Sequence, residues 1–525
     1  MNAAPPELDD AAQARLVAQI AAALGGDGPV EAFETHASRV LVTPVCAWKF
    51  KKPIAPGFLD YRTRELRRHL CTEELRLNRR LAPALYLEVL PVTGTPEAPR
   101  LGGEGPAIDW VLKMRSFAQD GLWDRLAARG ALGAAQIDAL VAVLVPFHAA
   151  AAAAPADGAF GDPQQVRAPM LENLDALDTL LAAGEAGALL ARLRAWEQQR
   201  FAALAPVFAA RLDQGRVREC HGDLHLGNVV EIEGRTTVFD CIEFNAGFRW
   251  IDVASEVAFM AMDLHAHGLP ALAQRFVDGW MAASGDYEAA RVLRYYLVHR
   301  ALVRAKVAAL RAAQPGAPAE AAADAQRYLA LAVAATETCR PLLLVTHGVS
   351  GSGKTMRTQA LVEQFGALRV RADVERKRLF GLAPLERPDA ALQPRLYGPE
   401  AGTATYARLL EAAAALLDGG WPAVLDATFL HRPARDAARR FAAARGAGFV
   451  LLDFGADEAT LRERVAARAT RGDDASDADL AVLEAQLRGG EPLAGNELAD
   501  TWPVPPDGTP DWAQLLARLD GAGAV

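Results

Sequence analysis

The stretch "HGDLHLGNVV", residues 221–230, holds two histidines, an aspartate and an asparagine within eight positions. Asp223 precedes Asn228 by five positions, and the chain continues as "VVEIEGRTTVFD" to a second aspartate, Asp240. The central "EG" of this continuation is typical of a tight hairpin turn, which makes Asp240 the end of the returning strand. The spacing predicts a polar loop, a hairpin and an acidic strand end in direct succession.

Phosphoryl transfer requires these residue types in this order. In catalytic loops of the pattern H-R-D-x-x-x-x-N, the base aspartate precedes a metal-binding asparagine by five positions. A second metal-binding aspartate follows. We therefore predict that Asp223 orients an acceptor hydroxyl and takes its proton, while Asn228 and Asp240 hold Mg²⁺ against the phosphates of ATP.

A zinc site is the alternative for the same loop. His221, Asp223 and His225 alternate along the chain, as ligands on a strand or loop do. The stretch contains no HExxH pattern, and no cysteine pair lies nearby. The spacing therefore favours the kinase interpretation over the metal cluster.

The segments before the loop predict a small sheet followed by helices. "SRVLVTPVCAWKF" (38–50) alternates apolar and polar residues like paired strands, and a charged helical stretch occupies 63–83. Further strands are expected in "LYLEVLPV" and "AIDWVLKMRSF". Helical patterns dominate 122–211 and 253–338. This order predicts an α+β domain.

A second phosphate motif begins near residue 342. "LLLVTHGVSGSGKT" is an apolar strand followed by the P-loop pattern G-x-x-x-x-G-K-T and a helical stretch. Backbone N–H groups of such a loop cradle phosphates, the lysine reaches the β- and γ-phosphates, and the threonine binds Mg²⁺. The predicted ATP-binding residues are Gly348, Ser350, Gly351, Ser352, Gly353, Lys354 and Thr355, with Thr355 also a metal ligand.

Two aspartates end later strands of this segment. Asp373 and Asp426 lie where a parallel α/β sheet places its ligands, at the carboxyl ends of strands. We predict Asp373 as a catalytic group at the acceptor and Asp426 as part of the Mg²⁺ shell; a helix N-cap is the alternative for each. Arg464, Arg468 and Arg471 share one helix face, and we predict that Arg464 and Arg468 contact ATP as a lid.

Composition limits the class of protein. A chain of 525 residues is too long for one core, so two or three domains are expected. The net charge of −9 argues against a dedicated nucleic-acid binder. The cysteine count is odd, without a CxxC pair, and the N-terminus lacks a signal-peptide pattern. These features predict a cytoplasmic protein with reduced thiols and no membrane association.

The domain boundary is expected between residues 335 and 340. We predict an N-terminal helical extension over 1–29, a first domain over 30–335 and an α/β P-loop domain with a parallel sheet over 340–520. Oligomeric state is left open by the sequence.

The motif "HGDLHLGN…FD" resembles the aminoglycoside phosphotransferase and choline kinase superfamily, whose fold is protein-kinase-like, over about residues 30–310. The resemblance implies His221 as the histidine that shapes the catalytic loop, Asp223 as the base, and Asn228 and Asp240 as metal ligands.

The same resemblance makes "CAWKFKKP" the strand with the phosphate-binding lysine. Lys49 is the preferred candidate, and Lys51, on the same face by period two, is the rival. The partner glutamate on the following helix is expected to be Glu74, with Glu73 and Glu65 as alternatives.

The sequence departs from the protein-kinase pattern at two places. No G-x-G-x-x-G loop precedes the lysine strand, and "DCIEFN" replaces D-F-G. Glu243 is thus an extra carboxylate beside the metal site, and Asp252 in "FRWIDVASE" is a candidate brace for the loop.

The C-terminal segment resembles small P-loop kinases of the zeta-toxin, chloramphenicol phosphotransferase and gluconate kinase group over about residues 340–515. "RADVERKRLFG" looks like that group's acceptor side, and "ASDAD" falls at its lid. The whole chain resembles bacterial bifunctional aminoglycoside phosphotransferase/ATP-binding proteins.

These resemblances imply an ATP- and Mg²⁺-dependent kinase with two active sites and small-molecule hydroxyl acceptors. Alternatives are a single catalytic domain with a nucleotide sensor, a nucleic-acid 5′-end kinase, and a nucleotide-gated interaction module without catalysis.

Overall fold

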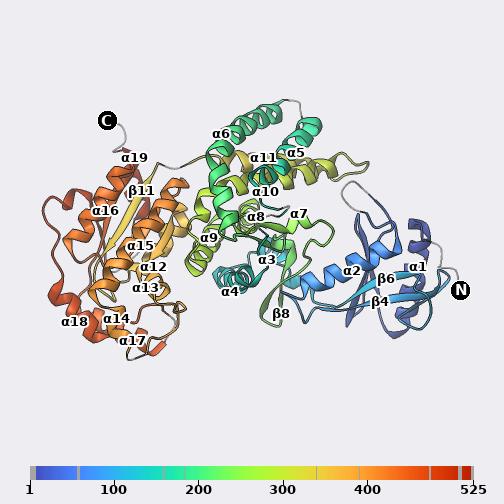
Figure 1. Cartoon of the computed structure of the whole chain (residues 1–525), viewed down its shortest axis with the longest axis horizontal. Coiled ribbons are helices and arrows are strands. Elements are labelled where there is room, and N and C mark those ends of the chain that lie inside the picture. Colours follow the sequence, from blue (N-terminus) through green and yellow to red (C-terminus); the bar gives the residue numbers. More distant parts are fainter. Residues whose placement is uncertain are drawn as a thin grey trace. The chain divides into compact units, whose positions relative to one another are not determined.

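The computed structural model describes residues 7–521 except 56–59, 156–157, 159, 182–183, 339, 390, 472–473 and 507–510. The chain forms two compact units, one of Met1–Val166 with Phe208–Asp263 and one of Arg167–Val207 with Leu264–Val525. Figure 1 shows the elements of both units along the chain. None of the described helices is long and apolar enough to cross a membrane.

A six-stranded antiparallel sheet begins the first unit. Its strand order is β1-β2-β3-β6-β4-β5. The strands are β1 Glu31–Glu34, β2 Ser38–Val42, β3 Cys46–Lys51, β4 Tyr86–Thr95, β5 Ala98–Leu101 and β6 Asp109–Arg115. Two helices accompany it, α1 Asp10–Leu24 and α2 Arg64–Asn78, with the 3₁₀ turn η1 Gly25–Asp27 after α1. The strands expected around 38–50, 85–92 and 107–117 are confirmed.

Strand β3 sends alternate side chains to two different cores. Trp48 and Phe50 pack in a cluster with residues of α1, whereas Ala47 packs in a cluster with Cys71 of α2. Because side chains alternate along a strand, Lys49 shares the α2 face with Ala47. The apolar residues of β3 thereby fix which way its lysines face.

The remainder of the first unit is mostly helical. Its elements are η2 Gln119–Gly121, α3 Trp123–Ala128, α4 Ala134–Ala150, β7 Val217–Glu219, η3 Leu226–Asn228, β8 Val229–Ile232, β9 Arg235–Val238, α7 Ala246–Arg249, β10 Trp250–Asp252 and α8 Val253–Ala266. β7 pairs with β10, and β8 pairs with β9. The turn between β8 and β9 has positive φ at both Glu233 (52°) and Gly234 (73°), the conformation that a two-residue hairpin requires. The predicted hairpin is confirmed.

Helices and a parallel sheet make up the second unit. The helices before the sheet are α5 Pro163–Leu181, α6 Glu185–Asp213, α9 Pro270–Ser284, α10 Ala289–Ala312 and α11 Ala319–Ala335. The sheet strands are β11 Leu342–His347, β12 Leu368–Arg371, β13 Ala423–Asp426, β14 Gly448–Phe454 and β15 Thr501–Val504, in the order β12-β13-β11-β14-β15. The predicted boundary at 335–340 falls between α11 and β11, inside this unit.

Helices flank the parallel sheet, as Figure 1 shows around β11. They are α12 Lys354–Phe365, α13 Ala372–Leu379, α14 Gln393–Leu396, α15 Pro399–Asp418, α16 Arg432–Ala444, α17 Glu458–Arg471, α18 Leu480–Gly489 and α19 Trp512–Gly521, with η4 Leu498–Asp500. Apolar residues of β11, β13 and β14 form a buried core with Leu361 of α12 and Trp512 of α19. Because β11 is central, the loop that follows it opens at the middle of the sheet edge.

Candidate active sites

Lys49 joins α2 to the strand end that carries Asp240. Its Nζ lies 2.8 Å from Glu74 Oε1 and 2.7 Å from Asp240 Oδ1. Glu74 is fully buried, and the Lys49 side chain is 19% exposed. Burial alone would lower the pKa of Lys49, but Asp240 and Glu74 raise it well above the ordinary lysine value. Lys49 is therefore a permanent cation beside a candidate metal ligand.

Lys51 lies on the same face and contacts Glu74 as well. Its Nζ is 2.6 Å from Glu74 Oε2 and donates a hydrogen bond to Glu243 Oε1, which also accepts from the Tyr61 hydroxyl at 2.9 Å. Lys51 is 1% exposed, so it lies deeper than Lys49. Lys49, the preferred candidate, and Lys51, its rival, thus share one glutamate, and Lys49 is the one bonded to Asp240.

The two lysines also change the acidity of Glu74. Burial would raise its pKa, but Lys49 and Lys51 together lower it to about 2. Glu73, one of the two alternative partners, instead pairs with Arg76 at 2.9 Å. Glu65, the other, is 71% exposed and lies 3.1 Å from Arg64.

The loop at 221–228 brings Asp223 and Asn228 together. Asn228 Nδ2 donates to the Asp223 carbonyl at 2.9 Å and lies 3.3 Å from Asp223 Oδ2. His225 Nε2 lies 3.4 Å from the same carboxylate oxygen. The Asp223 side chain is 37% exposed, so its carboxylate is accessible to solvent.

Asp240 follows β9 in an unusual backbone conformation. Its φ is 65°, in the left-handed region that costs a non-glycine residue about 1 kcal/mol or more. Its N–H donates to the Tyr86 hydroxyl at 3.0 Å, and the N–H of Cys241 donates to Asn78 Oδ1 at 2.9 Å. These contacts from buried residues hold the strained turn that aims the Asp240 carboxylate at Lys49.

His221 shapes the loop from inside the core. It is fully buried, and its Nε2 donates to the Phe239 carbonyl at 2.8 Å, while Nδ1 accepts the Asp223 N–H at 3.3 Å. One nitrogen donates and the other accepts, so the ring is neutral. Burial lowers the pKa of His221, in agreement with that tautomer. His221 is thus a positioning residue that ties Asp223 to the turn before Asp240.

Glu256 of α8 holds the start of the same loop. Its Oε1 accepts the N–H groups of His221 at 2.6 Å and Gly222 at 2.8 Å, and its Oε2 lies 2.7 Å from His148 Nε2 of α4. Burial opposes its ionisation, but His148 and the loop groups lower the pKa of Glu256 to about 2. Sequence patterns gave no signal for Glu256, because its partners lie far apart in the chain.

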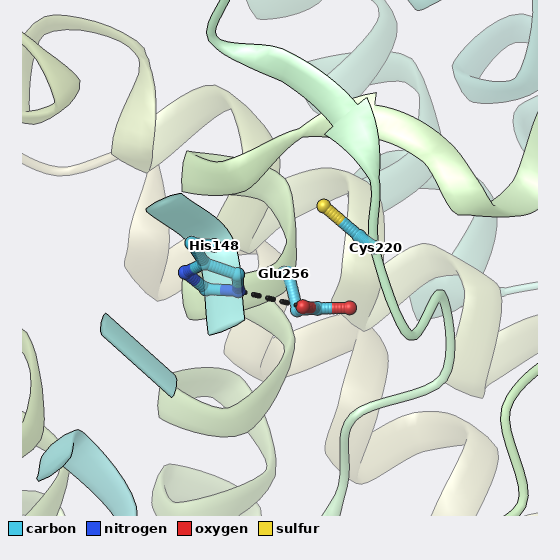
Figure 2. A group of neighbouring side chains, drawn as sticks. All are labelled: His148, Cys220 and Glu256. Carbon is cyan, nitrogen blue, oxygen red and sulfur yellow. Dashed lines mark hydrogen bonds and ion pairs between the residues drawn. The ribbon is translucent and has the colours of Figure 1, made fainter. Parts of the chain in front are cut away.

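His148, Cys220 and Glu256 also form a buried group whose potential ligand atoms lie within 4.8 Å of one another (Figure 2). The carboxylate of Glu256 is already bonded to His148 and to two backbone N–H groups. This hydrogen bonding explains the group as a support for the loop at 221–228.

Two more acids flank this loop. Asp263 Oδ2 accepts the Leu226 N–H at 2.9 Å. Asp252, the candidate brace, pairs with the buried Arg211 at 2.6 Å and accepts the Ala254 N–H at the start of α8. Asp252 therefore orders the beginning of α8.

The P-loop between β11 and α12 has the backbone that its glycines permit. Gly348 has φ 136° and Gly353 has φ 87°. A Cβ at Gly348 would lie 2.5 Å from the Phe454 carbonyl oxygen, so no larger residue fits there. Gly351 also has positive φ, and the Ser350 N–H donates to Gln486 Oε1 at 2.8 Å.

Lys354 folds back over this loop. Its Nζ donates to the carbonyl oxygens of Gly348 at 2.9 Å and Val349 at 2.8 Å, and lies 3.3 Å from Ser352 Oγ. Burial lowers the pKa of Lys354 to about 8, although Asp426 and Asp373 counteract part of the effect. A further negative group beside this ammonium would favour its protonated form.

Asp426 and Thr355 lie on neighbouring elements at the same sheet edge. Asp426 ends β13, which pairs directly with β11, and Thr355 is in the first turn of α12. Asp426 Oδ2 is buried and has no hydrogen-bond partner in the described part of the chain. A carboxylate and a hydroxyl are oxygen donors that suit Mg²⁺, so these residues fit a magnesium ion. Asp426 is not a helix N-cap.

Asp373 lies in the first turn of α13. Its Oδ1 accepts from Arg376 Nη1 at 2.8 Å. Burial opposes ionisation, but Arg376 and a hydrogen bond from Ser476 lower its pKa. The N-cap of α13 is Arg371, so Asp373 does not cap the helix.

Arg464 and Arg468, the arginines predicted to form a lid, extend from α17. Arg464 Nη1 lies 3.5 Å from the Gly351 carbonyl oxygen, and Arg468 Nη2 donates to the Ala478 carbonyl at 2.9 Å. Arg468 is also close enough to help lower the pKa of Lys354. The Arg471 side chain lies outside the described residues.

The "Phosphotransferase enzyme family" matches residues 60–293, and the "AAA domain" matches residues 343–493. These matches support a phosphotransferase built from two kinase-type domains, the second a P-loop nucleotide-binding domain. The predicted fold class is confirmed: a kinase-like α+β domain is followed by a P-loop domain with a parallel five-stranded sheet.

The chain is 30% identical to "Uncharacterized protein Rv2004c" of Mycobacterium tuberculosis (strain H37Rv) over 457 residues, which are 87% of this chain and 90% of that protein. The figures are the same for "Uncharacterized protein Mb2027c" of Mycobacterium bovis. The chain belongs to the family of these mycobacterial proteins.

Two solved structures are similar over one part of the chain each. A choline/ethanolamine kinase family protein from Mesorhizobium loti is 13% identical, with a TM-score of 0.39, over 62% of this chain and 95% of its own. A gluconokinase from Sinorhizobium meliloti is 24% identical, with a TM-score of 0.23, over 31% of this chain and 82% of its own.

Proposed function

We propose that this protein is an ATP-dependent kinase with two active sites, each transferring the γ-phosphoryl group to a hydroxyl of a small-molecule acceptor. The observation that carries the proposal is the position of Lys49, bonded to both Glu74 and Asp240. A lysine held between a helix glutamate and a metal-binding aspartate is the arrangement that phosphoryl transfer by kinase-like folds requires.

In the first site, magnesium ATP supplies the transferable group and the divalent charge. Lys49 binds phosphate oxygens, and the oxygens of Asn228 and Asp240 would hold the cation. Asp223 accepts a hydrogen bond from the acceptor hydroxyl, orients it and takes its proton as the new P–O bond forms and the bond to ADP breaks. The open position of the Asp223 carboxylate, 37% exposed, supports this role.

In the second site, the P-loop N–H groups and Lys354 bind the phosphates, and Thr355 and Asp426 would hold Mg²⁺. Arg464 and Arg468 neutralise charge from the α17 side. Asp373 orients the acceptor hydroxyl. The net charge of −9 favours small acceptors over nucleic acid, and we infer a cytoplasmic location from the reduced-thiol composition.

One observation favours a second candidate function, in which the P-loop domain senses nucleotide and only the first site is catalytic. The Asp373 carboxylate is paired with Arg376, and its lowered pKa makes it a weak base. In that case nucleotide binds at Lys354 without acceptor-dependent turnover.

The test is ATP turnover by the wild type, Asp223→Asn and Lys354→Ala, with and without a library of hydroxylated acceptors. Asp120→Asn is the matched control, because its side chain is 89% exposed. Two activities, each removed by one variant and stimulated by different acceptors, support two kinase sites. If neither variant changes turnover while both weaken ATP binding, the kinase proposal fails.

A further inference from the structure

Helix α9 lies within the part of the chain that matches the phosphotransferase family, yet it packs on the P-loop domain. β12 is the edge strand of the parallel sheet, and an edge strand presents unpaired backbone groups. Gln274 Nε2 of α9 donates to the carbonyl oxygens of Gly366 at 3.0 Å and Ala367 at 3.1 Å. The helix therefore satisfies backbone groups at the start of β12.

Asp278, one turn further along α9, continues these contacts. It is 4% exposed, and its Oδ1 accepts the backbone N–H of Arg369 at 2.7 Å. Its Oδ2 lies 3.6 Å from Nη2 of the same arginine. The Asp278 carboxylate thus accepts a backbone hydrogen bond from β12 and also pairs with the buried guanidinium of Arg369.

The guanidinium of Arg369 in turn holds the first turns of α12. Nη1 donates to the Thr355 carbonyl at 2.7 Å and lies 3.1 Å from Thr358 Oγ1, and Nη2 donates to Gln359 Oε1 at 2.7 Å. Thr355 follows Lys354 directly. Arg369 therefore forms hydrogen bonds with the helical turn that contains both the predicted phosphate-binding lysine, Lys354, and the candidate Mg²⁺ ligand, Thr355. Arg369 Nε is buried and has no hydrogen-bond partner among the described residues.

We propose that Asp278 is a positioning residue of the P-loop site, acting through Arg369 on the turn of Lys354 and Thr355. Replacing an outer-shell residue that orients a metal-ligating group, here the candidate Mg²⁺ ligand Thr355, typically weakens metal affinity about 10-fold or more. The inference rests on the proposed nucleotide binding at Lys354, but not on any acceptor or turnover. It means that the phosphotransferase segment completes the nucleotide site of the P-loop domain.

The experiment titrates MgATP into the full-length protein by calorimetry. A Lys49→Met background weakens the first site, and loss of a binding event in Lys354→Ala assigns that event to the P-loop. Asp278→Asn keeps an acceptor for the Arg369 N–H and removes the charge. Arg275→Gln is the matched control, because it breaks a different ion pair of α9, the one to Glu363 of α12 at 2.8 Å.

We expect Asp278→Asn to weaken the Lys354-dependent event about 10-fold and Arg275→Gln to change it less than about 2-fold. Because Asp278 acts through Arg369, the double variant with Arg369→Gln is expected to bind no more weakly than Arg369→Gln alone. Circular dichroism and thermal unfolding identify variants that have lost their fold.

A folded Asp278→Asn protein with wild-type affinity would overturn the inference, as would additive losses in the double variant. In both cases nucleotide binding at Lys354 stands. Absence of any Lys354-dependent binding in the parent protein would overturn the proposed P-loop function together with the inference.

Discussion

Lys51→Met is expected to destabilise the first unit strongly, whereas Lys49→Met is expected to affect catalysis. Lys51 is 1% exposed and pairs with Glu74 and Glu243, which are 0% and 7% exposed. Removing one partner of a buried ion pair leaves uncompensated charge and costs about 3–5 kcal/mol. Lys49→Met leaves Glu74 paired with Lys51, and Asp240 is 43% exposed, so the cost is about 1 kcal/mol.

Differential scanning calorimetry measures this difference. For a unit of this size, a loss of about 4 kcal/mol lowers Tm by about 12 °C and a loss of about 1 kcal/mol by about 3 °C. Lys49→Met should reduce kcat/KM about 10²-fold or more, because it removes a donor that neutralises transferring phosphate. Below its own transition, Lys51→Met should retain more activity than Lys49→Met.

Two further variants test the cause. Lys52→Met is the matched control: Lys52 pairs with Glu34, which is 59% exposed, so its removal should cost less than about 1 kcal/mol. Adding Glu243→Gln to Lys51→Met removes one unpaired buried charge and should recover part of the lost Tm. The reasoning is refuted if Lys49→Met is the more destabilising variant while Lys51→Met is the less active one.

Three other predictions follow from the two sites. Asp223→Asn should lower acceptor-dependent turnover about 10²–10⁴-fold and change nucleotide affinity less than about 2-fold. Single-turnover assays measure the first effect and nucleotide titration measures the second. Burial lowers the pKa of Lys354 to about 8, and bound phosphates would favour its protonated form. MgATP binding at the P-loop should therefore take up a proton, and the affinity should fall as pH rises above about 8. Calorimetry in two buffers of different ionisation enthalpy tests this, and equal binding enthalpies in the two buffers would contradict it. The charge of Glu256, whose pKa is lowered from 4.5 to about 2, stabilises the folded state above about pH 4.5, and this contribution is lost as pH falls through about 2. The Tm difference between wild type and Glu256→Gln should therefore shrink toward pH 2, and a constant difference would contradict the assignment.

The parts of the site that the sequence predicted are those encoded within short segments. Asp223, Asn228 and Asp240 lie on one loop and hairpin, and the P-loop is a single strand–loop–helix unit, so spacing alone carries their geometry. The alternation of β3 also placed Lys49 and Lys51 on one face. It could not choose between them, because the choice depends on Asp240 and Glu243, about 190 residues away.

The sequence did not predict the polar residues that are buried between segments far apart in the chain. Glu256 on α8 and His148 on α4 are 108 positions apart, and each taken alone resembles an ordinary helix residue. Their role follows from where the chain places two backbone N–H groups that need an acceptor in the core. Which buried backbone N–H groups need a side-chain acceptor depends on the folded backbone, and hydrophobic periodicity in the sequence cannot predict it.

The contacts of helix α9 with the P-loop domain also could not be predicted from the sequence. Gln274 and Asp278 are four positions apart, so they lie on one face of the helix, and a polar face is typically taken as solvent-exposed. Here both residues are buried because that face meets the edge of β12, where backbone carbonyl and N–H groups require polar partners. Composition places a boundary at 335–340, where the helical pattern gives way to an apolar strand. Residues about 60 positions before that boundary nevertheless form hydrogen bonds with the backbone groups of β12. The change in sequence pattern therefore shows where the P-loop segment begins. It does not show that the P-loop segment also depends on hydrogen bonds from α9.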